Sequence, residues 1–352
     1  MRKGIASPMS PIIMSPIIIM MCAAVLAATS AIVSAQASWN SANVPQPHLA
    51  KARALAAEDN SWRLIGLVTC YPADGQPSQR VNKDPGGFRV FDNVAYVGHG
   101  RTGPYAIETS DGIILIDSMN SPDDVEQVIL PNMRAVGMDP ARLKVLIISH
   151  GHGDHYGGAR YLQDKFGVQV HLSEADYALA ERAGGQPNAR VPAPRRDVVV
   201  KDGDTITLGN ESIKVFITPG HTPGSLSMLI PVLDRGQPRL MAYFGGVTNR
   251  NLSAEMHVAF DTSWGRLEQI VQDAKPDGWL ASHPNYDDAV YRIEQVRANA
   301  KDLPNPFVTG TASTLRFVQV VRECNLNHMD LARAMPAAGR GGRGAAVPAG
   351  AP

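Results

Sequence analysis

The stretch Ser149-His150-Gly151-His152-Gly153-Asp154-His155-Tyr156-Gly157-Gly158 places three imidazoles and one carboxylate within six positions. It follows the apolar run Val145-Leu146-Ile147-Ile148, which predicts a buried strand, and precedes a predicted helix at residues 157–166. Packing cannot account for this density, because each buried imidazole or carboxylate needs a polar partner. A shared metal cation would supply that partner.

The spacing inside this motif favours two adjacent metal positions over one. His150 and His152 alternate along an extended loop, so their side chains point to the same side. Asp154 and His155 come next and can turn toward a neighbouring point. We therefore expect two cations rather than one.

Two further histidines follow predicted strands in the second half of the chain. His221 lies in Thr218-Pro219-Gly220-His221-Thr222-Pro223-Gly224-Ser225, where proline and glycine fix a tight turn that presents a ligand rigidly. His283 lies just beyond the short strand predicted at residues 279–282. Neutral imidazole and carboxylate favour zinc, although iron and manganese are also compatible.

The rest of the pattern predicts one α/β domain, residues 88–335, that includes a C-terminal helix. Strands are predicted at 91–97, 105–109, 113–117, 145–148, 168–172, 197–200, 205–208, 213–218, 225–230, 240–244 and 279–282. Helices are predicted at 122–136, 157–166, 175–182, 264–274, 289–300 and 312–333. The repeated strand-then-helix order in two halves implies sheets covered by helices.

The N-terminal residues 1–37 read as a signal peptide. Arg2 and Lys3 precede an apolar run at 17–33, and Ala35-Gln36-Ala37 offers a cleavage site. The alternative is an uncleaved membrane anchor, because the run is nearly long enough to span a bilayer. Either reading exports the folded part, and cleavage predicts a periplasmic or secreted protein with no stable membrane association.

Two other segments carry weaker patterns. Residues 38–87 are rich in proline, asparagine, glutamine and aspartate and predict an irregular N-terminal arm. Residues 336–352 are glycine, alanine, proline and arginine apart from one valine, and they predict a disordered tail. After signal cleavage Cys70 and Cys324 remain, either as one long-range disulfide or as two buried thiols.

The charge composition of the chain indicates which kinds of partner it can bind. The chain has 352 residues with 33 Lys+Arg against 33 Asp+Glu, and no clustered basic excess of the kind that grips nucleic acid. We expect a small-molecule substrate and no nucleic acid, and the sequence does not predict an oligomeric state.

These motifs together resemble the metallo-β-lactamase superfamily, whose hallmark is His-x-His-x-Asp-His. The resemblance covers residues 88–306 and implies a four-layer αββα sandwich with the metals at one edge between the sheets. It implies ligand sets of His150, His152 and His221 for the first metal, and Asp154, His155 and His283 for the second. It also implies that Asp117, at the end of an early strand, orients the metal loop rather than ligating.

One departure from the superfamily pattern narrows the choice. Most of its hydrolases, glyoxalase II and the zinc lactonases among them, carry a bridging aspartate between the last two histidines. The corresponding stretch here, Ala242-Tyr243-Phe244-Gly245-Gly246-Val247-Thr248-Asn249, has no carboxylate. The site is therefore most similar to the third subclass of metallo-β-lactamases.

This resemblance implies a secreted enzyme with two zinc ions that opens the β-lactam amide with a metal-bound hydroxide and confers antibiotic resistance. Asp154 would be catalytic as well as a ligand, orienting the hydroxide and shuttling its proton. Thr248 and Asn249 are candidate donors to the substrate carboxylate. The alternatives are an exported lactonase or esterase of the same fold, a mononuclear iron dioxygenase acting on persulfides, and a periplasmic zinc-binding protein without catalysis.

Overall fold

The computed structural model describes residues 44–58, 70, 84–186, 189–250, 252–299 and 303–334. The predicted signal peptide and the predicted C-terminal tail lie outside these residues. The chain divides into two units, one of Gln46–Asp330 with Ala346–Pro352 and the other of Met1–Pro45 with Leu331–Ala345. Of the second unit the described residues are 44–45 and the helical 331–334.

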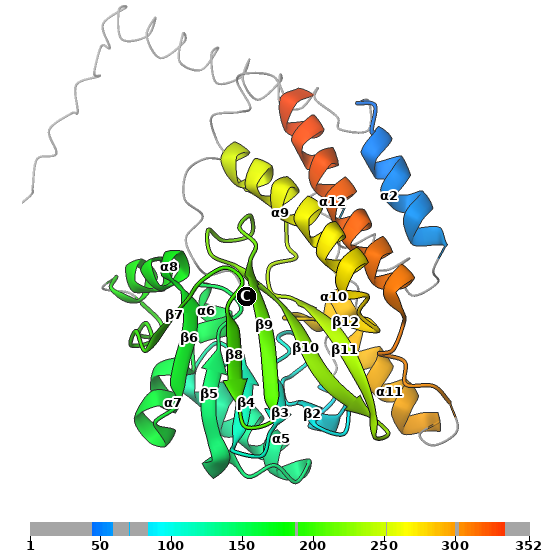
Figure 1. Cartoon of the computed structure of the whole chain (residues 1–352). Helices are drawn as coiled ribbons and strands as arrows, with labels where there is room; N and C mark the ends of the chain where they lie inside the picture. Colours follow the sequence, from blue (N-terminus) through cyan, green and yellow to red (C-terminus); the bar gives the residue numbers. More distant parts are fainter. Residues whose placement is uncertain are drawn as a thin grey trace, which may run out of the picture. The chain divides into compact units, whose positions relative to one another are not determined.

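The larger unit contains a mixed seven-stranded sheet (Figure 1). In spatial order its strands are β1 (Phe88–Arg89), β2 (Val94–Tyr96), β3 (Tyr105–Glu108), β4 (Ile113–Ile116), β5 (Leu143–Ile147), β6 (Gln169–Ser173) and β7 (Val198–Val200). Neighbours from β1 to β4 are antiparallel, and those from β4 to β7 are parallel. All four residues of β4 are buried because both faces of the sheet are covered, which explains its unbroken apolar run.

A five-stranded sheet faces the first one. Its order is β12 (Gly278–Ala281), β11 (Gln237–Phe244), β10 (Leu226–Asp234), β9 (Glu211–Ile217) and β8 (Thr205–Leu208). Strands β11 and β12 are parallel, and the other neighbours are antiparallel. The β10–β11 hairpin turns at Arg235 and Gly236, both at positive φ, as a tight two-residue hairpin turn requires. These two strands extend well beyond the predicted 225–230 and 240–244.

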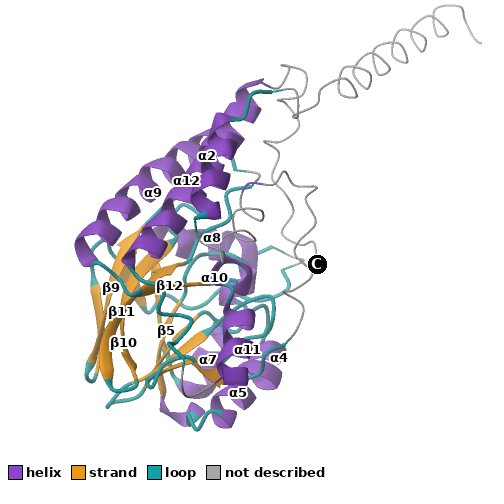
Figure 2. Ribbon diagram, turned by 90° about the vertical axis from the view of Figure 1, so that its right-hand side faces the viewer, coloured by secondary structure: helices purple, strands orange, loops and turns teal. Residues whose placement is uncertain are grey.

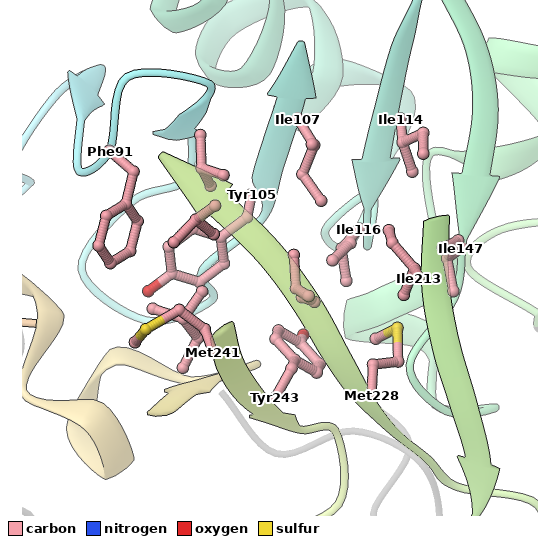
Figure 3. Close-up of a cluster of buried hydrophobic side chains, with 14 of the residues drawn as sticks. Phe91, Tyr105, Ile107, Ile114, Ile116, Ile147, Ile213, Met228, Met241 and Tyr243 are labelled. Carbon is pink, nitrogen blue, oxygen red and sulfur yellow. The ribbon is translucent and has the colours of Figure 1, made fainter. Parts of the chain in front are cut away.

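The main core lies between the two sheets (Figure 3). From the seven-stranded sheet and the segment before β2 come Phe91, Tyr105, Ile107, Ile114, Ile116 and Ile147, and from the five-stranded sheet Ile213, Met228, Met241 and Tyr243. Tyr105 and Tyr243 meet edge to face with ring centroids 6.4 Å apart, which joins the sheets near the end where the candidate ligands lie.

Helices cover the two outer faces (Figure 2). The seven-stranded sheet is covered by α4 (Pro122–Asp124), the π-helical segment η3 (Val125–Ile129), α5 (Leu130–Ala135), α7 (Ala159–Phe166) and α8 (Glu174–Gly184). The five-stranded sheet packs against α9 (Ala254–Ala274) and α12 (Thr311–Ala334), with α2 (Pro47–Ala57) in the same cluster. The remaining described helices are η4 (Pro140–Arg142), α6 (Gly153–Tyr156), α10 (Pro284–Asp287) and α11 (Ala289–Asn299). The predicted four-layer αββα sandwich is therefore confirmed.

Two predictions about local structure are corrected. The supposedly irregular arm contains α2, whose Ala52 and Ala56 are buried in the apolar cluster with α12, so tertiary packing stabilises a helix that polar composition obscured. Helix α9 begins ten residues before the predicted Trp264, because the Ser253 side chain caps it by accepting from Met256 N.

Cys70 and Cys324 form a disulfide, which decides between the two alternatives left open by the sequence. Within the described residues, every helix is too short or too polar to cross a membrane.

Truncating the core between the sheets tests this architecture. Ile213 is fully buried, so we expect Ile213→Ala to lower the free energy of unfolding by about 2–5 kcal/mol, through lost apolar burial and a residual cavity. Val258→Ala, at a side chain 55% exposed, is the control and should change it by no more than about 0.5 kcal/mol. Denaturant titration measures both, and equal effects would contradict the assignment of the core.

Candidate metal centre

Three imidazoles meet at the ends of strands from both sheets. His150 follows β5, and His221 follows β9 in the loop before β10. Their Nε2 atoms lie 3.1 Å apart, and with His152 they offer three ring nitrogens all within 4.8 Å of one another. The structure thus brings together the first predicted ligand set.

The second predicted set lies beside the first. His155 Nε2 is 3.2 Å from His283 Nε2 and 3.3 Å from Asp154 Oδ2. His283 Nε2 is 3.6 Å from the same carboxylate oxygen. The His150 and His155 rings are 3.9 Å apart between centroids, so the two sets adjoin.

These spacings fit metal ions. Tetrahedral nitrogen ligands at about 2.0–2.1 Å from a cation lie roughly 3.3 Å from one another. The ligand-atom separations of 3.1, 3.2, 3.3 and 3.6 Å bracket that value. The unprotonated Nε2 atoms of His150 and His221 repel one another at 3.1 Å, and a cation between them removes the conflict. The fold therefore presents a His-rich metal-binding site with room for two ions.

Asp117 is the main organiser of the His150–His155 loop. Its Oδ1 accepts a hydrogen bond from Ser149 N at 2.7 Å, and its Oδ2 accepts from Ser149 Oγ at 2.8 Å. Oδ2 also lies 2.8 Å from His155 Nδ1 and accepts from Tyr243 OH at 3.2 Å. Both carboxylate oxygens are thus occupied, and Asp117 directs His155 Nε2 toward the site without reaching it. This geometry matches the predicted orienting role.

Backbone carbonyl groups hold the rings of His221 and His283. His221 Nδ1 lies 2.8 Å from the Thr248 carbonyl oxygen, and His283 Nδ1 lies 2.8 Å from the Arg101 carbonyl oxygen. Each ring nitrogen facing away from the site therefore donates to an oxygen, which leaves Nε2 unprotonated and available to a metal. The Arg101 contact has no signal in the sequence, because the loop that supplies it lies 182 positions from His283.

Burial lowers the pKa of His150 and His221, whereas neighbouring carboxylates raise the pKa of His155. Burial lowers the pKa of His221 to about 3, with His152 adding to the effect, and burial also lowers the pKa of His150 well below its usual range. Burial alone would lower the pKa of His155 as well, but Asp154 and Asp117 outweigh it and raise the pKa to about 10. Although burial opposes it, His155 in turn holds the pKa of Asp154 below its ordinary value. In the metal-free protein His155 and Asp154 form an ion pair.

Of the two predicted substrate contacts, Asn249 needs correction, and Thr248 stays a prediction. Asn249 is only 1% exposed, and its Nδ2 donates to the Val321 carbonyl in α12, so it is turned away from the metal cluster. Thr248 positions His221 through its carbonyl, and its hydroxyl is 2.6 Å from Tyr286 OH. Asn249 therefore packs against α12 and does not face a substrate. The Thr248 carbonyl holds the ring of the candidate metal ligand His221.

Sequence reasoning missed Asp176, in the first turn of α8. This carboxylate is fully buried and accepts hydrogen bonds from both histidine-bearing loops. An aspartate near a helix N-terminus is common, so the sequence alone gave no reason to single it out.

The chain is similar in sequence and fold to known proteins. Residues 101–234 match the sequence profile of the metallo-β-lactamase superfamily. The structure is similar to BJP-1, a subclass B3 metallo-β-lactamase of Bradyrhizobium japonicum, with 26% identity and a TM-score of 0.60 over 73% of this chain and 99% of that one. It also shares the fold of the metallo-β-lactamase GOB-18 from Elizabethkingia meningoseptica, with 21% identity and a TM-score of 0.60 over 74% of this chain and 97% of that one.

Curated relatives have other activities. An N-acyl homoserine lactonase from a Bacillus species is 28% identical over 49% of this chain and 77% of its own length. A hydroxyacylglutathione hydrolase from Acidiphilium cryptum is 33% identical over 28% of this chain. The chain spans only 35% of that hydrolase.

The fold and the His-rich site define a metal-binding hydrolase. More specifically, the chain carries a metallo-β-lactamase superfamily domain, and the similarity to a subclass B3 enzyme agrees with the third-subclass resemblance predicted from sequence.

The charge state of His155 can be checked in the metal-free protein. Since its pKa is raised to about 10, we expect its ring to stay protonated at pH 8 and to lose the proton near pH 10, whereas His221 stays neutral down to about pH 3. A metal at this position must displace the proton, so metal affinity there should rise with pH up to about 10.

Imidazole resonances followed by NMR across pH measure this directly. Asp117→Asn removes one of the two carboxylates and should lower the pKa of His155, while His221 should titrate as before. A His155 ring that is neutral at pH 8 in the wild-type protein would contradict the prediction.

Proposed function

We propose that this chain is an exported, zinc-dependent hydrolase that opens the β-lactam amide. The two ligand sets, His150/His152/His221 and Asp154/His155/His283, would each hold one zinc ion. Neutral imidazoles with one carboxylate are a donor set that zinc favours. The predicted signal peptide supports export. N-terminal sequencing of the mature periplasmic protein tests this prediction, and we expect the first residue to be Ser38.

One observation carries the choice of substrate class. Asp154 is the sole carboxylate in the metal-competent groups of the described residues. Where a bridging aspartate would be expected, Gly245 and Gly246 pass so close to the site that side chains do not fit. A Cβ at Gly246 would lie 2.9 Å from His221 Cβ, and one at Gly245 would lie 2.7 Å from Ser149 Cβ. The absence of that carboxylate is thus built into the packing, which favours the third-subclass lactamase arrangement.

Bound zinc would polarise the scissile carbonyl and lower the pKa of water toward neutrality. The chain's own residues would orient the attacking water. Asp154 is ionised at neutral pH because its pKa is lowered, and its side chain remains 36% exposed. The ionised, partly exposed carboxylate can therefore accept a hydrogen bond from an attacking water and orient it at the mouth of the site.

A lactonase is the second candidate. The Bacillus lactonase is 28% identical over 77% of its length, so an acyl lactone is a reasonable substrate for the same scaffold. The lack of a bridging carboxylate argues against it.

The decisive measurement combines metal content with hydrolysis of a penicillin, a cephalosporin, a carbapenem, an acyl homoserine lactone and a glutathione thioester. We expect two zinc ions per chain and the highest kcat/KM on a β-lactam. His152→Ala removes a proposed metal ligand. Loss of a residue that only orients a ligand usually lowers activity by up to about 100-fold, so we expect His152→Ala to lower kcat/KM by more than that.

Three outcomes would overturn the proposal. Preference for the lactone would establish the second candidate, and one iron per chain with oxygen consumption would establish a dioxygenase. Full activity in His152→Ala would remove the assigned site altogether.

A further inference from the structure

One buried carboxylate joins the two loops that carry the first ligand set. Asp176 Oδ2 accepts from Gly151 N at 2.8 Å and from Thr222 Oγ1 at 2.6 Å. Its Oδ1 accepts from Gly224 N at 2.9 Å. Gly151 lies between His150 and His152, and Thr222 follows His221. Asp176 therefore fixes the distance between the loop with two of these ligands and the loop with the third.

The backbone of both loops is shaped to reach this carboxylate. A Cβ on Gly151 would lie 2.8 Å from the Asp176 carbonyl oxygen and 3.1 Å from its Cβ. A Cβ on Gly224 would lie 1.9 Å from Ser173 Oγ and 3.0 Å from Asp176 Cγ. Glycine at both positions allows the close approach, since a side chain would push each loop away.

Asp176 is itself held firmly. It lies in the first turn of α8, where its backbone N–H donates to the side chain of the N-cap Ser173. Ser173 Oγ donates in turn to the Gly224 carbonyl at 2.8 Å. The carboxylate is fully buried, so the three hydrogen bonds from the loops replace its lost hydration.

The hydrogen bonds that the Asp176 carboxylate accepts come from residues next to or near the ligands of the first set. Among the second set, His155 is oriented by Asp117 and His283 by the Arg101 carbonyl. Among the described residues, the Asp176 carboxylate accepts hydrogen bonds from Gly151, Thr222 and Gly224, and neither of these anchors is one of them.

We propose that Asp176 is a positioning residue that sets the geometry, and hence the affinity, of the first metal position alone. This inference rests on the proposed function only in that the site binds metal. A carboxylate is needed because its oxygens only accept, whereas asparagine would turn an NH₂ group toward one of three donors.

The test measures metal binding by the metal-free full-length protein. Zn²⁺ affinities of the two positions are determined by competition with a chelating dye, and Co²⁺ absorption spectra report which position is filled. His221→Ala and His283→Ala supply the reference spectra for loss of the first and second positions. In Asp176→Asn we expect the first position to weaken about 10- to 100-fold while the second is unchanged.

Two further variants control for folding. Thr222→Val removes a single donor at nearly the same volume and should give a smaller loss at the first position, with little additional loss in the Asp176→Asn background. Asp277→Asn is the matched control, because this partly buried carboxylate accepts from Leu240 N and Arg239 Nη1 at the far end of β12. It should leave both positions unchanged.

The outcomes separate the two proposals. Equal weakening of both positions, or none, in Asp176→Asn and Thr222→Val would overturn the role of Asp176. Wild-type protein that binds neither Zn²⁺ nor Co²⁺ would instead overturn the proposed metal centre.

Discussion

Five imidazole rings lie close together at one end of the sandwich. The structure there depends on hydrogen bonds that hold the Nδ1 atom, which faces away from the site, in four of these rings. Neighbouring rings lie only 3.9–5.0 Å apart between centroids. Free rings at this density would rotate to bond with one another or with water. Ser149 Oγ at 3.1 Å, the Asp117 carboxylate and two backbone carbonyls hold four of them instead. The Nε2 atoms consequently converge on points that a cation can occupy.

Asp117 connects this end to the fold as a whole. It follows β4 with φ at +64°, a conformation that costs free energy in a non-glycine residue. That backbone places its carboxylate against Ser149 after β5 and against Tyr243 of β11 in the opposite sheet. Tyr243 is also a member of the core between the sheets. The strain at one residue is thus sustained by contacts from both sheets, and packing of the sandwich and orientation of the metal loop form one network.

The sequence predicted what is local or strongly periodic. The strands flanking the histidine motif and the helices at 289–300 and 312–333 appear within a few residues of their predicted bounds, because buried apolar periodicity dominates there. The candidate ligand histidines could be recognised because they are dense in a short motif or follow a strand. Asn249 was misassigned because a polar residue after a strand can turn either toward a site or toward a helix, and only the position of α12 decides which. The Arg101 carbonyl and Asp176 act through tertiary contacts that no local pattern records.

The close approach of Gly245 and Gly246 also bears on how this site relates to those with a bridging carboxylate. Replacing Gly246 by aspartate would bring a new Cβ to 2.7 Å from Ser225 Oγ as well as 2.9 Å from His221 Cβ. Contacts that short force the His221 loop to move, and the same loop is tied by Thr222 and Gly224 to Asp176. Gly246→Asp therefore cannot add the carboxylate while keeping the first ligand set in place. An aspartate at Gly246 would require the His221 loop to move, so the glycine pair is a structural property of this site and carries more weight than one missing side chain.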